Sequence, residues 1–265
     1  MAAARTRALL SGSHLSAFPA LLPVYPHMQP VCRRGHTAPR PGARPVARHK
    51  AHTPVPPLGK IGLRPRAMTT HPIFDIHTHR RDALSALISA DPGFTPIEGR
   101  HYSVGIHPWH ASDATSGMLE RLDSDAAMQC VAAIGETGLD TRCDVPLQRQ
   151  TPLFLHHIEL SERLEKPLIL HAVGAFPQII AIRRRTAPRQ PWIVHGFRGK
   201  PQLAQELLRH GLYLSLGERF NPSAAAVIPS DRLLVETDES LADIGLTASQ
   251  LPQLDPTLPY RLLGL

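Results

Sequence analysis

The sequence predicts an α/β fold, a single (β/α)8 barrel behind an N-terminal extension. Its 265 residues suit either one barrel of roughly 250 residues or two smaller domains, so the length alone does not decide. From residue 73 onward, short β-branched and apolar runs alternate with longer helical segments, which is typical of βα units around a parallel sheet. Polar groups recur where these runs end, as they do at the active-site face of a barrel. The predicted strands span residues 73–76, 86–90, 102–106, 130–134, 167–170, 192–194, 212–215 and 233–235.

The first 67 residues form an extension that we expect to be disordered. They contain nine Arg, two Lys, eleven Pro and no Asp or Glu, and such a composition cannot bury enough apolar surface to offset its ordering entropy. Three interpretations are open: an organelle transit peptide, a basic tail that binds something acidic, and a start-site artefact. Met68 stands five residues before the first predicted strand, which favours the artefact. The predicted domain division is therefore 1–67 and 68–265.

The charge of the predicted barrel argues against a general nucleic-acid-binding surface. Residues 68–265 hold 18 Lys and Arg against 22 Asp and Glu, so the basic balance of the whole chain belongs to the extension. Proteins that bind nucleic acid through their overall field use Lys and Arg to neutralise phosphates. A polyanion would therefore have to be bound by local groups and metal ions near the site.

The cysteine spacing and the hydropathy of the sequence indicate the cellular compartment of the protein. Cys32, Cys130 and Cys143 follow no CxxC spacing, which fits a reducing compartment with neither a disulfide framework nor a thiolate metal cage. No apolar run approaches the roughly 18 residues that a membrane helix needs. We therefore expect a cytoplasmic protein that does not bind a membrane, and no feature indicates a protein partner.

Two segments between the strands have clear helical spacing. Residues 148–165 repeat leucines and His157 with the helical period, and residues 202–210 repeat leucines in the same way. Pro167 ends the first helix and opens the next strand. After these elements, the tail from about residue 241 to residue 265 contains three prolines and does not resemble the final helix that such a barrel expects.

The first predicted strand ends in two histidines, His77 and His79, which are two residues apart. In an extended strand this period sends both imidazoles to the same face. Imidazole nitrogen suits Zn, Mn, Fe or Ni, and neutral histidine is the commonest protein metal ligand. An isolated His-x-His pair is also compatible with two polar residues at a strand exit, so the remaining strand ends decide between the two interpretations.

Four more strands end in a group that can bind a metal. These groups are Glu136, His171, His195 and Asp238. A single polar residue at a strand end is commonly a cap, but five of eight strands delivering six such groups to one barrel face indicate a site. The sequence therefore predicts a metal centre at the carboxyl ends of the strands.

Six segments carry a family resemblance. They are FDIHTHR, SVGIHPW, AIGETGLD, PLILHA, IVHGFRG and LLVETD. In this order and spacing they resemble the TatD family of metal-dependent hydrolases, within the amidohydrolase-like barrels, and GIHPW and HGFRG resemble a shorter branch of that family. The resemblance spans about residues 73–239. It implies a phosphodiesterase of the kind that includes deoxyribonucleases trimming DNA or oligonucleotide strands from the 3′ end.

The resemblance also implies a division of the ligands between two divalent metal ions (Mg, Mn or Zn). One metal would be held by His77, His79 and Asp238, and the other by His171 and His195. Glu136 would bridge them, because a carboxylate can span two cations. Such a pair can activate a water and stabilise the attacking and leaving oxygens of a phosphoryl centre. We expect the carboxylate next to the first metal, Asp238, to serve as general base as well.

Residues around the ligands are candidates for substrate contact and for orienting the imidazoles. His107 is interpreted either as a donor to a substrate phosphate or as a structural cap of its strand. Glu236 and Asp140 are candidates for accepting the second N–H of a ligand histidine. The alternatives are a loop cap for Asp140 and a solvated strand end for Glu236.

The chain departs from the family pattern at one position. Val173 stands where many members carry an Arg that pairs with phosphate. Arg198 or Lys200 could substitute, because Arg matches phosphate geometry bidentately, or both are solvated loop charges. Trp109 and Phe197 are expected near the mouth, where single aromatics are commonly packing residues rather than stacking platforms.

The preferred function from sequence is thus a two-metal hydrolase of phosphodiester bonds. One alternative is a barrel hydrolase with the same metals that cleaves a small amide, lactone or phosphoester, because the Lewis-acid role is common to these reactions. Another is a metal-binding protein impaired in catalysis by its atypical tail, since an uncovered barrel flank exposes apolar surface.

Overall fold

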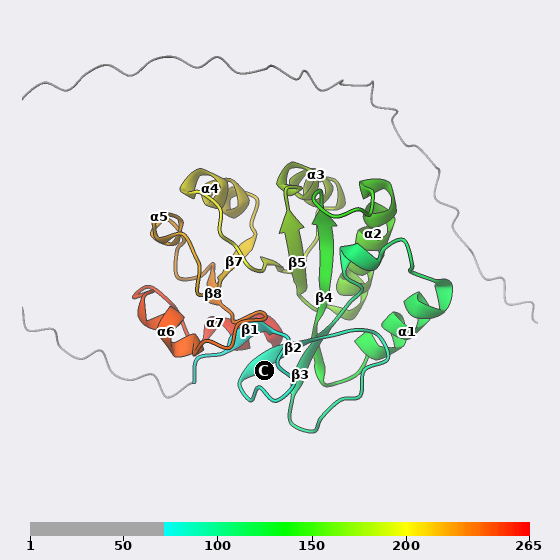
Figure 1. Ribbon diagram of the computed structural model, residues 1–265, viewed down its shortest axis with the longest axis horizontal. Coiled ribbons are helices and arrows are strands. Elements are labelled where there is room, and N and C mark those ends of the chain that lie inside the picture. Colours follow the sequence, from blue (N-terminus) through cyan, green and yellow to red (C-terminus); the bar gives the residue numbers. More distant parts are fainter. Residues whose placement is uncertain (1–71) are drawn as a thin grey trace, which may run out of the picture. The chain divides into compact units, whose positions relative to one another are not determined.

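The computed structural model describes residues 72–265, all of which belong to one compact unit (Figure 1). The predicted disorder of residues 1–67 lies outside the described residues. Eight parallel strands form one sheet in chain order, as predicted. They are β1 (Asp75–Thr78), β2 (Ala86–Ala90), β3 (His101–Val104), β4 (Val131–Asp140), β5 (Leu168–Val173), β6 (Trp192–Val194), β7 (Tyr213–Leu216) and β8 (Leu233–Val235).

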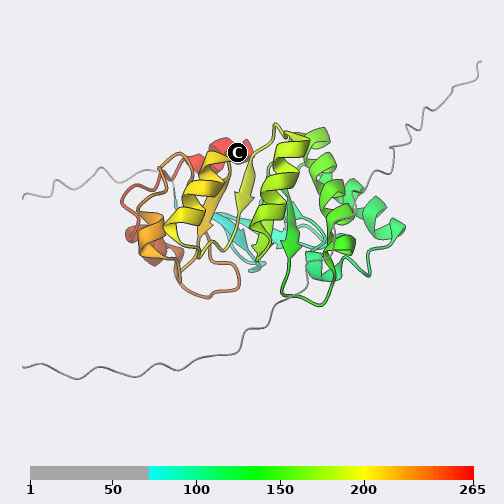
Figure 2. The same ribbon diagram turned by 90° about the horizontal axis from the view of Figure 1, so that it is seen from above.

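The helices follow the strands from β3 onward. They are η1 (Pro108–His110), α1 (Ser116–Ala126), α2 (Leu147–Leu164), α3 (Phe176–Thr186), α4 (Pro201–Arg209), α5 (Pro222–Ala225), α6 (Ile244–Ser249) and α7 (Leu258–Leu263). The two helices predicted from periodicity, α2 and α4, begin and end within one residue of their expected bounds. Seen from above, α2, α3 and α4 lie next to one another along one side of the sheet (Figure 2).

The regular alternation of strand and helix that the sequence predicts fails at the first two connections. In this part of the described chain, residues 79–85 and 91–100 contain no helix. The first connection has room for less than two helical turns. The second contains two prolines and two glycines, the residues that most destabilise a helix interior.

The core consists of two apolar clusters on opposite faces of the sheet. Leu168 and Leu170 belong to the larger cluster, which includes buried residues of α1 to α4, whereas Ile169 between them belongs to the smaller one. Because successive strand residues point to opposite faces, the smaller cluster lies on the face turned away from those helices. It consists of strand residues together with Phe74, which precedes β1, and Leu258 and Leu263 of α7.

The C-terminal tail forms no long final helix, as the sequence predicted, but it does pack against the barrel. Two six-residue helices, α6 and α7, take the place of one helix. Leu258 and Leu263 are buried, while Leu241 and Leu246 remain exposed. The tail thus covers part of the barrel and leaves apolar side chains uncovered nearer its start.

Strands β1 and β8 meet at a seam that nearly closes the barrel. Thr78 and Asp238 form a parallel bridge, in which the Asp238 N–H donates to the His77 carbonyl (2.9 Å). Below it, the buried carboxylate of Asp75 accepts hydrogen bonds from the hydroxyl (2.6 Å) and the backbone N–H (3.1 Å) of Thr237. Burial raises the pKa of Asp75 to about 6, and these hydrogen bonds oppose the shift. The seam brings the last strand against the first.

Candidate metal centre

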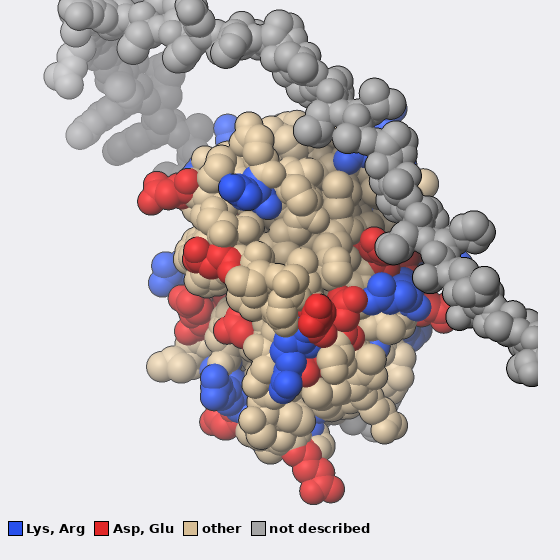
Figure 3. All heavy atoms as spheres, turned by 90° about the vertical axis from the view of Figure 1, so that its right-hand side faces the viewer, with Lys and Arg blue, Asp and Glu red and all other residues tan. Residues whose placement is uncertain are grey.

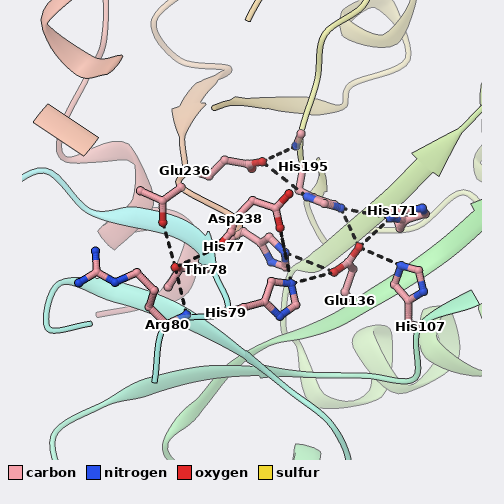
Figure 4. A network of polar contacts seen from close by, with 12 residues as sticks. His77, Thr78, His79, Arg80, His107, Glu136, His171, His195, Glu236 and Asp238 are labelled. Atoms are coloured by element: carbon pink, nitrogen blue, oxygen red, sulfur yellow. Dashed lines mark hydrogen bonds and ion pairs between the residues drawn. The ribbon is translucent and has the colours of Figure 1, made fainter. Parts of the chain in front are cut away.

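His77 and His79 converge at the carboxyl end of β1, where the register with β2 shifts between Asp75 and Thr78. Their ring centroids lie 5.1 Å apart. The Nε2 atoms of both histidines lie near Glu136 Oε2, at 3.3 and 3.7 Å, and near Asp238 Oδ1, at 3.6 and 3.5 Å (Figure 4). We call His77, His79 and Asp238 the first group.

The other carboxylate oxygen of Glu136 faces a second set of imidazoles. Oε1 lies 2.7 Å from His171 Nδ1, 2.8 Å from His195 Nε2 and 3.2 Å from His107 Nε2 (Figure 4). We call His171, His195 and His107 the second group. Each oxygen of one buried carboxylate therefore faces one group.

Glycines on β4 and beside it allow the strands to approach closely enough for this arrangement. A Cβ on Gly105 would lie 2.6 Å from the backbone carbon of Gly135, and a Cβ on Gly138 would lie 2.0 Å from the carbonyl oxygen of His171. Neither position can accept a larger residue without moving backbone. The close approach brings Glu136 on β4 near His107, which follows β3, and near His171 on β5.

Glu136 interacts strongly with the surrounding imidazoles. Burial opposes its ionisation, but His195, His107 and His171 outweigh burial and hold the pKa of this carboxyl well below its usual range. Conversely, burial would lower the pKa of His195, but the Glu136 carboxylate outweighs burial and raises it. Glu136 is therefore a carboxylate at neutral pH and favours positive charge around it.

Asp238 reaches the first group from an unusual backbone conformation. Its φ of 57° lies in the left-handed region, which few non-glycine residues adopt. Residues held in such conformations cluster at active sites and ligand clamps. The backbone hydrogen bonds of the seam, from His79 N–H to the Asp238 carbonyl (3.1 Å) and from Asp238 N–H to His77, hold it there.

Two carboxylates lie behind the second group, at the positions that the sequence suggested. Glu236 Oε1 lies 3.5 Å from His195 Nδ1 and also accepts a hydrogen bond from the Gly196 N–H (2.6 Å). Asp140 Oδ2 lies 3.3 Å from His171 Nε2. Asp140 also caps its own loop, because Oδ1 accepts the N–H of Arg142 (2.7 Å), so both interpretations of this residue hold.

His107 both caps η1 and belongs to the polar network around Glu136. Its Nδ1 accepts the backbone N–H of Trp109 (3.3 Å), so Nε2 of the neutral ring carries the hydrogen and donates toward Glu136 Oε1. Burial lowers the pKa of His107, and the Glu136 carboxylate opposes that shift. The imidazole therefore stands beside the carboxylate that separates the two groups.

The residues considered for substrate contact differ in their exposure and in the cavity that they line. Phe197 is buried, as a packing residue would be. Trp109 is largely exposed and lines the cavity above the two groups, whose volume is about 340 Å³. Arg198 lies outside this cavity and lines a neighbouring one of about 430 Å³, which shares Asp238 with it. Lys200 is exposed at the start of α4 and lines neither.

Sequence reasoning missed four polar residues that also line the cavity. They are Ser89, Asp91, His110 and Glu239. Asp91 directly follows the predicted second strand, and Glu239 directly follows Asp238. The rule that carboxyl ends of barrel strands face the site would have found both, since each lies at such an end.

The donor set suits a metal ion. Among the residues that the structure describes, neither ring nitrogen of the fully buried His77 has a hydrogen-bond partner. A buried polar atom without a partner destabilises the fold unless another group binds it. Imidazoles and carboxylates within 4.8 Å of one another, as in the set of His77, His79 and Glu136, offer divalent cations the ligands they prefer.

Comparison with known proteins shows the same family along most of the barrel. A family model described as TatD related DNase matches residues 96–243. The uncharacterized metal-dependent hydrolase YcfH of Escherichia coli K12 is 35% identical over 147 residues, which cover 52% of this chain and 54% of YcfH. The 3′-5′ ssDNA/RNA exonuclease TatD of Pectobacterium atrosepticum is 32% identical over 146 residues, 51% of this chain and 56% of that protein.

A solved structure shares the fold. The crystal structure of YJJV, a TatD homolog from Escherichia coli K12, superposes with a TM-score of 0.57 at 19% identity and covers 73% of this chain and 98% of its own. At that identity the likeness shows the barrel alone. The chain spans about half the length of the curated relatives that it matches. Since the family model covers more than half of the chain, the chain belongs to the TatD related DNase family.

Proposed function

We propose that the chain is a two-metal hydrolase of phosphodiester bonds, a deoxyribonuclease that removes nucleotides from the 3′ end of a strand. The observation that carries the proposal is the position of Glu136, whose two carboxylate oxygens face two separate groups of imidazoles and carboxylate. One metal ion would be held by His77, His79 and Asp238 and the other by His171 and His195, with Glu136 shared. When bound, such ions supply Lewis acidity at a phosphoryl centre.

Asp238 is the proposed general base. Its side chain is 30% exposed at the cavity, whereas that of Glu136 is 8% exposed and surrounded by imidazoles. A base must reach both the proton and the solvent-filled space in which the substrate lies. Asp238 would accept the proton of the attacking water, and the left-handed backbone at this residue keeps its carboxylate aimed at the cavity.

His107 and Arg198 are the proposed substrate contacts. The Nε2–H of His107, which donates toward Glu136 Oε1, would turn to a phosphate oxygen of a substrate bound beside His171 and His195. Arg198 lines the neighbouring cavity, which shares Asp238 with the first. Its guanidinium would supply the bidentate phosphate contact that Val173 cannot make.

The substrate class is inferred from the cavity, the surface and the relatives. A space of about 340 Å³ lies at the small end of ligand pockets and suits one nucleotide at the end of a strand. On the visible part of the face in Figure 3, acidic and basic side chains are interspersed. Such a surface favours recognition of a strand end over binding along a duplex. The Pectobacterium relative is named for exonuclease action on single strands.

The proposal is tested with the full chain and single-stranded DNA labelled at either end. Mg²⁺ or Mn²⁺ should support stepwise shortening from the 3′ end, and a chelator should stop it. The double variant Glu136→Ala, Asp238→Ala should lose the activity, while the control Asp144→Ala, Glu159→Ala, which removes two exposed carboxylates, should retain it. Undiminished cleavage by the first double variant would exclude the assigned site.

A second candidate is favoured by the valine at position 173. Without an arginine there, the same metals could serve a hydrolase of a small phosphoester, lactone or amide. A substrate panel with the same preparation decides between them. Turnover of small esters without any cleavage of oligonucleotides would support the second candidate and contradict the first.

A further inference from the structure

Trp109 is the one bulky aromatic side chain that the structure exposes at the mouth of the metal centre, among the residues it describes. It is 54% exposed, whereas the other tryptophan, Trp192, is fully buried in the core. Trp109 lines the same cavity as Glu136 and His171. An aromatic side chain in the wall of a cavity that also holds polar groups is placed to contact a ligand bound there.

The indole is held firmly although it is exposed. Pro108 is buried and begins the turn of η1, which directs the next residue outward. The indole Nε1–H donates to Asp140 Oδ2 (2.7 Å), and the ring meets His107 edge-on with centroids 4.7 Å apart. Its polar group and its inner contacts are thus satisfied within the protein, and what it offers outward is aromatic surface.

The position of the ring relative to the metal centre is equally well defined. Asp140, which accepts from the indole, also lies 3.3 Å from His171 Nε2. The rings of Trp109 and His171 lie 5.9 Å apart at 77°. A ligand on the outer surface of the indole would therefore lie beside the second group, at a position set by hydrogen bonds rather than by a mobile side chain.

We propose that Trp109 is a stacking site for the base of the nucleotide at the end of a single strand. The inference rests on the proposed function and adds a subsite to it. A fixed aromatic ring favours a flat heteroaromatic ligand, and stacking tolerates any base because every base has a π-face. It lets a barrel that holds more Asp and Glu than Lys and Arg bind a strand end, with the scissile phosphate in the same cavity.

Binding is tested without turnover. In the full chain with chelator, a single-stranded DNA decamer should quench tryptophan emission in a saturable way, because Trp109 is exposed and Trp192 is not. The quench should disappear in Trp109→Phe, which removes the reporter. A decamer whose 3′-terminal residue is abasic should quench much less. Equal quenching by the abasic and normal decamers, or no quenching at all, would overturn the stacking site.

Kinetics separate stacking from a purely structural role. Trp109→Ala should raise the KM for the decamer about tenfold or more and lower kcat by a smaller factor, since base stacking on an aromatic contributes about that much affinity. Trp109→Phe should recover most of the KM, because Phe keeps an aromatic ring but cannot donate to Asp140. Failure of Phe to recover the KM would instead show that Trp109 acts through Asp140.

The outcomes distinguish this inference from the proposed function. If the wild-type chain cleaves the decamer and Trp109→Ala cleaves it with an unchanged KM, the stacking site is wrong and the nuclease stands. If the wild-type chain cleaves no oligonucleotide, the nuclease is wrong, and the quenching experiment still decides whether the ring binds a base. Leu84→Ala, which shortens an exposed apolar side chain outside this cavity, is the matched control.

Discussion

His157 is a fully buried histidine. The helical spacing of the sequence predicted its place on a helix but not its hydrogen bonds. Its Nε2 accepts the backbone N–H of Ile106 (3.0 Å), so Nδ1 carries the hydrogen and donates to the Leu153 carbonyl (2.8 Å). Ile106 immediately precedes His107. The side chain thus ties α2 to the segment that carries His107, and it does so only in its neutral form, because Nε2 must accept.

Protonation of His157 should destabilise the fold. Burial lowers its pKa from 6.5 to about 4. Between these values the unfolded chain binds a proton that the folded chain does not, so stability falls as the pH drops from 6.5 to 4 and is unaffected above that range. A shift of this size corresponds to about 3 kcal/mol. Chemical denaturation at pH 7 and at pH 4.5 measures the loss.

A variant isolates this contribution. His157→Gln keeps an acceptor and a donor without titrating, so its free energy of unfolding should fall less between pH 7 and pH 4.5 than that of the wild type. His156→Gln, on the neighbouring and partly exposed position, is the control and should retain the larger part of the wild-type dependence. Identical pH profiles for wild type and His157→Gln would refute the assignment.

At the scale of elements, the seam between β1 and β8 depends on a buried carboxylate. Thr237→Val should destabilise the fold by about 1–3 kcal/mol, because it leaves Asp75 buried without the hydroxyl donor at 2.6 Å. Thermal and urea unfolding measure the change. Thr237→Ser keeps the hydroxyl and should stay close to the wild type. A loss in Thr237→Ser without a loss in Thr237→Val would mean that the methyl group, not the hydrogen bond, matters.

The short helix α7 should contribute to stability although the sequence did not predict a closing helix. Leu258 is 4% exposed and packs with strand residues of the smaller apolar cluster. Leu258→Ala should cost about 2–4 kcal/mol through lost burial and the remaining cavity. Leu246→Ala on α6, where the side chain is 64% exposed, should change the free energy of unfolding by less than about 0.5 kcal/mol. Similar losses in both variants would contradict the packing of α7.

At the scale of the whole molecule, metal binding and folding should be coupled. The donors come from β1, β4, β5 and the segments after β6 and β8, so they are assembled only in the folded barrel. A metal at 100 times its dissociation constant stabilises the folded state by about 2.7 kcal/mol. For a domain of roughly 200 residues, this raises the Tm by about 5–10 °C.

Scanning calorimetry with Mn²⁺ and with chelator measures that shift. The double variant Glu136→Ala, Asp238→Ala should show a much smaller difference between the two conditions, because both groups lose a ligand. An equal rise of Tm in the variant would place the stabilising ions elsewhere on the chain.

The strands and the convergence of polar groups could be predicted from the chain alone. Strand-forming runs are local patterns, and in a parallel barrel all carboxyl ends meet at one face, so His77, His171 and His195 had to approach one another once the strands were recognised. The helices α2 and α4 followed from a local period as well. In each case the feature is determined either by residues a few positions apart or by the rule that parallel barrel strands end at the same face.

Contacts between segments far apart in the sequence required the folded structure. Three features depend on how closely distant strands approach one another. They are the separate orientation of the two Glu136 oxygens, the place of His107 in the second group and the exposure of Trp109. No local period encodes those distances, because they result from the packing of glycines such as Gly105 against β4 and from the seam. The proposed site residues could therefore be identified in the chain, and the family resemblance implied their division into two groups. The distances between these groups and the open aromatic surface beside them arise from packing across the whole barrel.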